Sequence, residues 1–87
     1  MALVFIPALL RHLTGGKGEV NAPGATVRQV IDNLDQIYPG IRDAFVDGSR
    51  LRSNLSVAVD GEVSSKGLLE KVGESSEVHF LPAVRGG

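Results

Sequence analysis

The chain contains no cysteine and no tryptophan, and its aromatic side chains are limited to three phenylalanines and one tyrosine in 87 residues. The lack of cysteine excludes disulfides, thiolate zinc sites, cysteine nucleophiles and thiol redox chemistry. It fits a reducing compartment and leaves stability to core packing alone. The scarcity of aromatic residues argues against a stacking platform for single-stranded nucleic acid.

Neither sign of charge is in excess, because nine Lys and Arg stand against ten Asp and Glu, for a net charge of -1. Such a balance produces no strong field that would attract nucleic acid or an anionic membrane. The longest mostly apolar run, Ala2–Leu10, is too short to cross a bilayer as a helix, and no basic residue precedes it as in a secretory signal. We therefore expect no nucleic-acid partner, no membrane association and a cytoplasmic location.

The residue types that usually carry catalysis are few and lack partners. His12 and His79 have no serine in a Gly-x-Ser-x-Gly turn and no cysteine with which to pair. Asp32 and Asp35 are neighbours on one helix face, which is typical of a solvated surface. The run Gly15–Gly18 lacks the Ser or Thr that follows Lys in a phosphate-binding loop. We expect no catalytic residue, no metal ligand and no cofactor bound by this chain.

Apolar periodicity and turn residues predict a single small domain. The predicted strands are Leu3–Ile6, Glu19–Asn21, Leu55–Val59, a brief return strand at Val63, and Glu77–Leu81. The predicted helical segments are a main helix from Thr26 to Tyr38 and a single turn at Ile41–Val46. Between them and the later strands, Asp47–Ser53 is expected to be a polar surface connection, and Gly67–Gly73 a turn that packs Leu68 and Val72 inward.

Three sets of apolar side chains are expected to build the core. They are Val27, Val30, Ile31, Leu34 and Ile37 of the helix, Leu55, Val57 and Val59 of a strand, and Leu9, Leu10 and Leu13 of a connection. The continuous apolar run Leu3–Ile6 is typical of a central strand. We predict an α+β fold in which the first and last strands are parallel neighbours at the centre of a mixed sheet and the helix crosses one face.

The end of the chain carries the most specific signal. Pro82 ends the last strand, and two glycines, Gly86 and Gly87, close the sequence. Because glycine has no side chain, such an end can enter a narrow channel and bring the terminal carboxylate to a reactive centre. Chance or a cloning remnant are the alternative explanations of the two glycines.

Together these features resemble the ubiquitin-like small sulfur carriers of the MoaD/ThiS type. The resemblance covers nearly the whole chain and rests on Ile6-Pro7, Leu10-Arg11, Thr14-Gly15-Gly16, the helix from Thr26 to Tyr38, Phe80–Val84, and Gly86-Gly87. It is greatest to the carrier that supplies sulfur to a cysteine synthase, followed by the molybdopterin synthase small subunit. Arg85 departs from the small residue that is common at its position.

The resemblance implies a ubiquitin-like β-grasp domain over residues 1–82, with four to five strands, and a flexible tail over 83–87. It also implies that Gly87, preceded by Gly86, is adenylated by a ubiquitin-activating-type enzyme that uses ATP and magnesium, and is then converted to a thiocarboxylate. Pro82, Ala83, Val84 and Arg85 would guide the tail into this enzyme and into a sulfur-acceptor enzyme. The acceptor would be a cysteine synthase-like enzyme or the molybdopterin synthase large subunit, and the carrier itself would catalyse nothing.

Two other functions remain open from the sequence. The same activated terminus would serve a covalent protein modifier, and a non-covalent interaction module would carry the tail incidentally. The docking face is also open, because either Val4 and Ile6 or Leu3 and Phe5 face away from the helix. An apolar outer sheet face would mark a partner site, whereas connecting segments that cover it would make it core.

Overall fold

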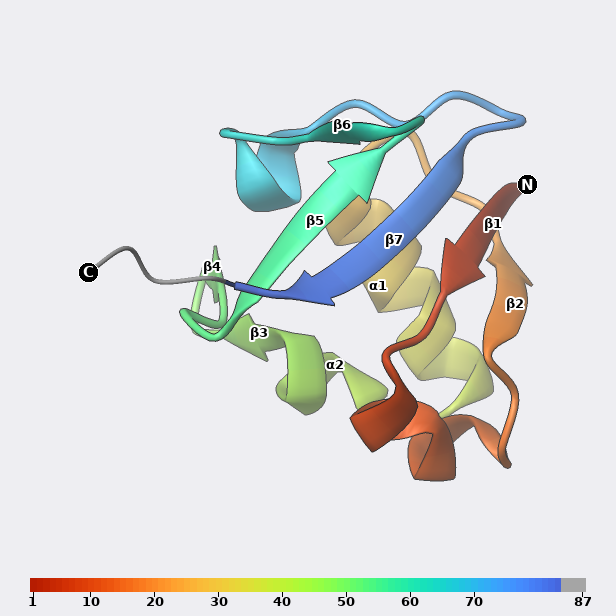
Figure 1. The fold of residues 1–87 in the computed structure, drawn as a ribbon. Helices are drawn as coiled ribbons and strands as arrows, with labels where there is room; N and C mark the ends of the chain where they lie inside the picture. The colour runs from red at the N-terminus through yellow and green to blue at the C-terminus, as the bar shows by residue number, and fades with distance from the viewer. Residues whose placement is uncertain (84–87) are drawn as a thin grey trace.

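The computed structural model describes residues 1–83, which form a five-stranded mixed sheet crossed on one face by the main helix (Figure 1). The strands lie in the order β2-β1-β7-β5-β6. Their bounds are β1 (Ala2–Phe5), β2 (Glu19–Ala22), β5 (Leu55–Val59), β6 (Glu62–Val63) and β7 (Glu77–Pro82). The first and last strands are parallel neighbours at the centre, as predicted, while the other pairs are antiparallel. The α+β prediction is confirmed.

Helix α1 (Val27–Ile37) begins where the sequence places it. The Thr26 side chain accepts a hydrogen bond from the Gln29 N–H at 3.2 Å and caps the first turn. Four of the five predicted inward residues are buried, but Ile37 is 53% exposed and was wrongly assigned to the core. At 100° per residue, Ile37 lies about 70° from the centre of the buried stripe, furthest of the five, and the helix ends there.

The segment between α1 and β5 contains more structure than expected. The helical turn appears as α2 (Ile41–Phe45), as predicted, but a small hairpin of β3 (Val46–Asp47) and β4 (Arg50–Leu51) follows it. Asp47–Ser53 lies largely on the surface, as predicted, but the hairpin within it was not predicted. Two-residue strands are too short to show an alternating pattern, and only the positive φ of Gly48 (65°) marks their turn.

The core lies between the sheet and the two helices, and the rings of Phe45 of α2 and Phe80 of β7 meet in it at a centroid distance of 4.4 Å. The 3₁₀-helix η1 (Ala8–Thr14) closes one end of it with Leu10 and Leu13. Leu9 is 87% exposed, so its predicted place in the core was wrong. A 3₁₀-helix has three residues per turn, which puts Leu10 and Leu13 on one side and Leu9 on another. A second 3₁₀-helix, η2 (Gly67–Leu69), buries Leu68 as expected.

The β5–β6 turn is fixed to the start of β7 by one side chain. Asp60 adopts a positive φ of 52° in this turn, and its carboxylate accepts hydrogen bonds from the Glu77 N–H at 2.9 Å and the Ser76 hydroxyl at 2.7 Å. Both hydrogen bonds lower the pKa of the Asp60 carboxyl below its ordinary value, and the one from the Glu77 N–H has the larger effect. The buried Ser76 hydroxyl also accepts from the Gly73 N–H at 2.8 Å, so the network joins the β5–β6 turn to the loop that precedes β7.

Candidate functional site

The last two residues that the structure describes, Pro82 and Ala83, are held at the edge of β5. Pro82 is the last residue of β7 and lies opposite Leu55 of β5. The N–H of Ala83, which the sequence assigns to the tail, donates a hydrogen bond to the carbonyl oxygen of Asn54 at 2.9 Å. Val84, Arg85, Gly86 and Gly87, the other residues of the predicted tail, lie outside the described residues. The root of the tail is thus held by β5 and by the loop that precedes it.

Two apolar hollows flank this tail root. The outer hollow, of about 380 Å³, opens on the free face of the sheet between Phe5, Leu9 and Leu81. The inner hollow, of about 120 Å³, lies toward α2 and includes Leu9, Ala44 and Leu55 in its lining. Pro7, Leu9 and Pro82 line both hollows and form the ridge between them. No sequence pattern indicates this ridge, because it joins residues more than 70 positions apart.

The choice between the two faces of β1 is settled by burial. Val4 and Ile6 are buried beneath α1, whereas Leu3 and Phe5 are only partly buried and lie on the outer face. The Phe5 ring stacks on the His79 ring of the adjacent β7, with centroids 3.9 Å apart and an interplanar angle of 7°. His79 Nε2 also lies 3.4 Å from the Glu77 carboxylate. His79 therefore faces outward, between an aromatic ring and one carboxylate.

Two hydrogen bonds hold the segment that carries Pro7 and Leu9. The Leu10 N–H donates to the Pro7 carbonyl at 2.9 Å, and the Arg11 Nε–H donates to the Ile6 carbonyl at 3.1 Å. These contacts tie η1 to the end of β1. Sequence reasoning singled out Leu10-Arg11 only by resemblance, and the structure shows that Arg11 has this architectural role.

The glycine-rich turn after η1 uses its amide groups internally. The Gly16 N–H donates to the Arg11 carbonyl at 2.8 Å and the Lys17 N–H to the Thr14 carbonyl at 3.3 Å. The buried Thr14 hydroxyl donates to the Lys17 carbonyl at 2.6 Å. A phosphate cradle needs free N–H groups, so this segment is a turn between η1 and β2.

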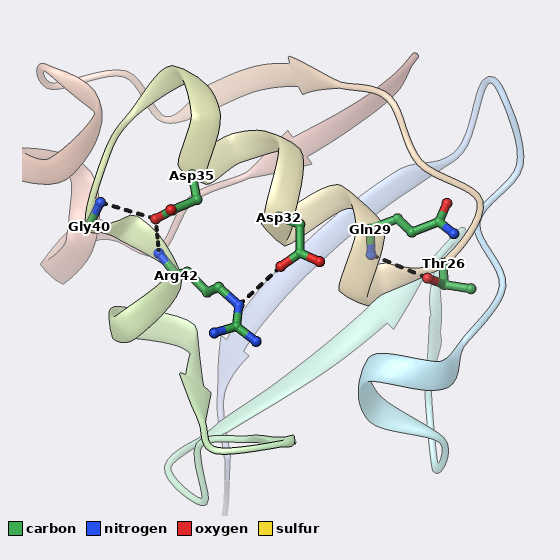
Figure 2. Close-up of polar contacts among 6 residues, drawn as sticks. All are labelled: Thr26, Gln29, Asp32, Asp35, Gly40 and Arg42. Atoms are coloured by element: carbon green, nitrogen blue, oxygen red, sulfur yellow. Dashed lines mark hydrogen bonds and ion pairs between the residues drawn. The ribbon is translucent and has the colours of Figure 1, made fainter.

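Asp32 and Asp35 of α1 have structural partners on α2 (Figure 2). The Asp35 carboxylate accepts hydrogen bonds from the Gly40 and Arg42 N–H groups, each at 3.0 Å. Asp32 forms an ion pair with Arg42, also at 3.0 Å. The prediction that both carboxylates only face solvent missed these contacts. For Asp35, the signal was an acidic residue placed five to seven positions before the N–H groups at the start of a following helix.

Across residues 1–83, no three His, Asp or Glu side chains converge in a way that would hold a metal ion. In the same residues, no helix has both the length and the apolar character needed to cross a membrane.

Comparison with known proteins identifies the family. The model described as the ThiS family matches residues 4–87. Sulfur carrier protein CysO of Mycobacterium tuberculosis is 37% identical over 97% of this chain and 96% of its own, and its crystal structure superimposes with a TM-score of 0.87. CysO in the Amycolatopsis orientalis BexX/CysO complex is 37% identical, with full coverage of both chains and a TM-score of 0.90. SAMP1 of Haloferax volcanii is 27% identical over 99% of this chain and 98% of its own, with a TM-score of 0.70. The chain belongs to the ThiS family of ubiquitin-like β-grasp proteins and is a homologue of the sulfur carrier CysO.

Proposed function

We propose that this protein carries sulfur as a thiocarboxylate on Gly87. The observation that carries the proposal is the position of Gly86-Gly87 just beyond a rigid tail root, in a chain that matches the ThiS family through its last residue. Residues 1–82 would form the domain that partner enzymes bind, and residues 83–87, anchored at Ala83, would form the arm that delivers the terminus.

The chemistry begins with activation of a poor electrophile. The Gly87 carboxylate attacks the α-phosphorus of ATP, and pyrophosphate leaves with the formation of an acyl adenylate. Sulfide then attacks the acyl carbon and expels AMP, and loss of the proton on sulfur leaves a thiocarboxylate on Gly87. Glycines at both terminal positions have no Cβ to clash with a narrow channel. Val84 and Arg85 would guide the arm, the first by apolar contact and the second toward acidic groups.

ATP and magnesium belong to the adenylating enzyme in this scheme, and the carrier is a co-substrate that catalyses nothing. Its histidines support that division of labour: His79 is engaged with Phe5 and Glu77, and His12 is exposed on η1. The second partner is the sulfur acceptor. CysO of Amycolatopsis orientalis forms a complex with BexX, and we assign a partner of that kind to the acceptor role here. The likeness to CysO favours cysteine biosynthesis over molybdopterin biosynthesis.

The test is intact mass spectrometry after incubation with an adenylating enzyme, ATP, magnesium and a sulfide source, followed by thiol-selective alkylation. Because the chain has no cysteine, the alkylating reagent has no side-chain thiol to modify. We expect exchange of one oxygen for sulfur and a label confined to the C-terminal peptide, which separates this product from oxidation of Met1. A chain lacking Gly87 is the control and should stay unmodified. An unchanged mass, with an enzyme that converts Mycobacterium tuberculosis CysO in parallel, contradicts the proposal.

A covalent modifier is the second candidate, favoured by the similarity to SAMP1, whose name is small archaeal modifier protein 1. The same adenylated terminus would then pass to a lysine amine and form an isopeptide bond. Trypsin cleavage after Arg85 would leave Gly-Gly on the target lysine, and mass spectrometry of cell digests detects this remnant. A non-covalent interaction module, by contrast, would keep its partners after removal of Gly86 and Gly87.

A further inference from the structure

Leu9 is the most exposed large apolar side chain in residues 1–83, at 87%, and it stands beside the tail root. We propose that Leu9 and the inner hollow form a docking site for the sulfur-acceptor enzyme, which inserts an aliphatic or aromatic side chain from the mouth of its channel. The inference rests on the proposed function, because it assigns the acceptor to the surface around the arm that carries Gly87.

The chain reaches Gly87 within four residues of Ala83, and an extended chain spans at most about 14 Å over that length. Ala83 is bonded to Asn54, and Asn54 lines the inner hollow with Leu9 and Pro82. An enzyme that encloses Gly87 therefore brings the mouth of its channel within this distance of Ala83. The short arm thus places the partner beside the inner hollow that Leu9 lines.

The turn that carries Leu9 is held in place by hydrogen bonds at both ends. Pro7 precedes η1 with φ of -57°, its carbonyl accepts the Leu10 N–H, and Arg11 binds the Ile6 carbonyl. Leu9 is thus presented on a fixed turn, so little backbone freedom is lost when a partner covers it. An apolar side chain held in place at the centre of an interface is the usual form of a binding hot spot.

The lining of the inner hollow is uncharged among residues 1–83. It is formed by Pro7, Leu10, Ala44, Leu55 and other residues without an ionisable side chain. A charged group of a partner would lose its hydration there without gaining a counter-charge. The fitting occupant is an apolar side chain that packs against Leu9 on one side and Ala44 on the other.

The experiment measures binding of the full-length chain to BexX, the protein that accompanies CysO in the Amycolatopsis orientalis complex. Leu9→Ala should weaken binding about tenfold through lost apolar burial, and Leu9→Glu should weaken it further. Ala44→Leu, which fills the inner hollow, should weaken binding while Leu9 is intact. Circular dichroism and thermal unfolding verify that each variant is folded.

Leu69 offers a matched control, since it is also a leucine exposed on a 3₁₀-helix (72%), in η2, which contacts α1 and β4 and lies away from η1 (Figure 1). Leu69→Glu should leave binding within twofold of wild type. Failure of the wild type to bind BexX, equal binding by wild type and Leu9→Glu, or equal losses at Leu9 and Leu69 each overturns the docking site. Loss at Leu9 alone, with no thiocarboxylate formed in the mass assay, supports the site and rejects the carrier chemistry.

Discussion

The backbone N–H of Ala83 meets the carbonyl oxygen of Asn54 at 2.9 Å, so β7 continues to pair with the β4–β5 loop one residue beyond its last strand position. This contact holds Ala83, the last residue that the structure describes, against the loop that precedes β5.

Ala83→Pro removes that N–H and leaves the Asn54 carbonyl without its partner. We expect the free energy of unfolding to fall by about 1 kcal/mol, the net value of one such hydrogen bond. Urea denaturation measures this change, and Ala83→Ser, which keeps the N–H, is the control. Equal stability of the two variants would show that the contact does not hold the tail root.

The parts of this fold that sequence predicts are those governed by local periodicity. Val27, Val30, Ile31 and Leu34 repeat on one side of a helix, so their burial follows from spacing alone. Phe5 and Val4 have no such signal, because Leu3–Ile6 is apolar at every position and only the place of α1 decides which pair is inside. The sequence therefore left two possible pairs of residues on the outer face of β1, and the structure was needed to choose between them.

Some features of the candidate site are also indicated by the sequence, and others appear only in the structure. The two terminal glycines and Pro82 are visible in sequence because their residue types are unusual there. The ridge of Pro7, Leu9 and Pro82 is not, because the parallel pairing of β1 with β7 brings together opposite ends of the chain. Leu9 was misassigned to the core for a related reason, since apolar character was the only evidence and the 3₁₀ geometry of η1 was not foreseen.

Phe45 is completely buried against Phe80, so we expect its removal to be costly. Phe45→Ala should lower the free energy of unfolding by about 3–5 kcal/mol through lost burial and the cavity left behind. Phe5→Ala should cost much less, because Phe5 is already partly in contact with water. Urea denaturation of both variants makes the comparison, and similar losses would mean that the outer face is as well packed as the core.

Asp60 gives the stability of the protein a specific pH dependence. Its pKa is lowered in the folded state by hydrogen bonds from the Glu77 N–H and the Ser76 hydroxyl. A lowered folded-state pKa contributes stability above the unfolded value, and that stability is lost as pH falls through the folded value. Asp60→Asn should therefore lower the melting temperature at pH 7.

The difference in melting temperature between wild type and Asp60→Asn should shrink as the pH falls below about 4, where the unfolded-state carboxyl gains its proton. Calorimetric scans from pH 7 to pH 2.5 follow this difference, in which the titration of other carboxyls largely cancels. Asp47→Asn, outside the network, is the control and should change the melting temperature little. A constant difference for Asp60→Asn would place its contribution in packing rather than in charge.

Asp32 and Asp35 allow a direct comparison of two carboxylates on one helix (Figure 2). Asp35 accepts two backbone N–H groups at the start of α2, so Asp35→Ala should cost about 1–2 kcal/mol, as loss of a helix cap does. The Asp32–Arg42 pair is exposed, with 48% and 38% of the side chains accessible, and Asp32→Ala should cost less than about 1 kcal/mol. Addition of 1 M salt should reduce only the smaller effect, because it screens an exposed ion pair more than a pair of hydrogen bonds. If Asp32→Ala proves the more damaging change, then the ion pair, rather than the cap, aligns α2 with α1.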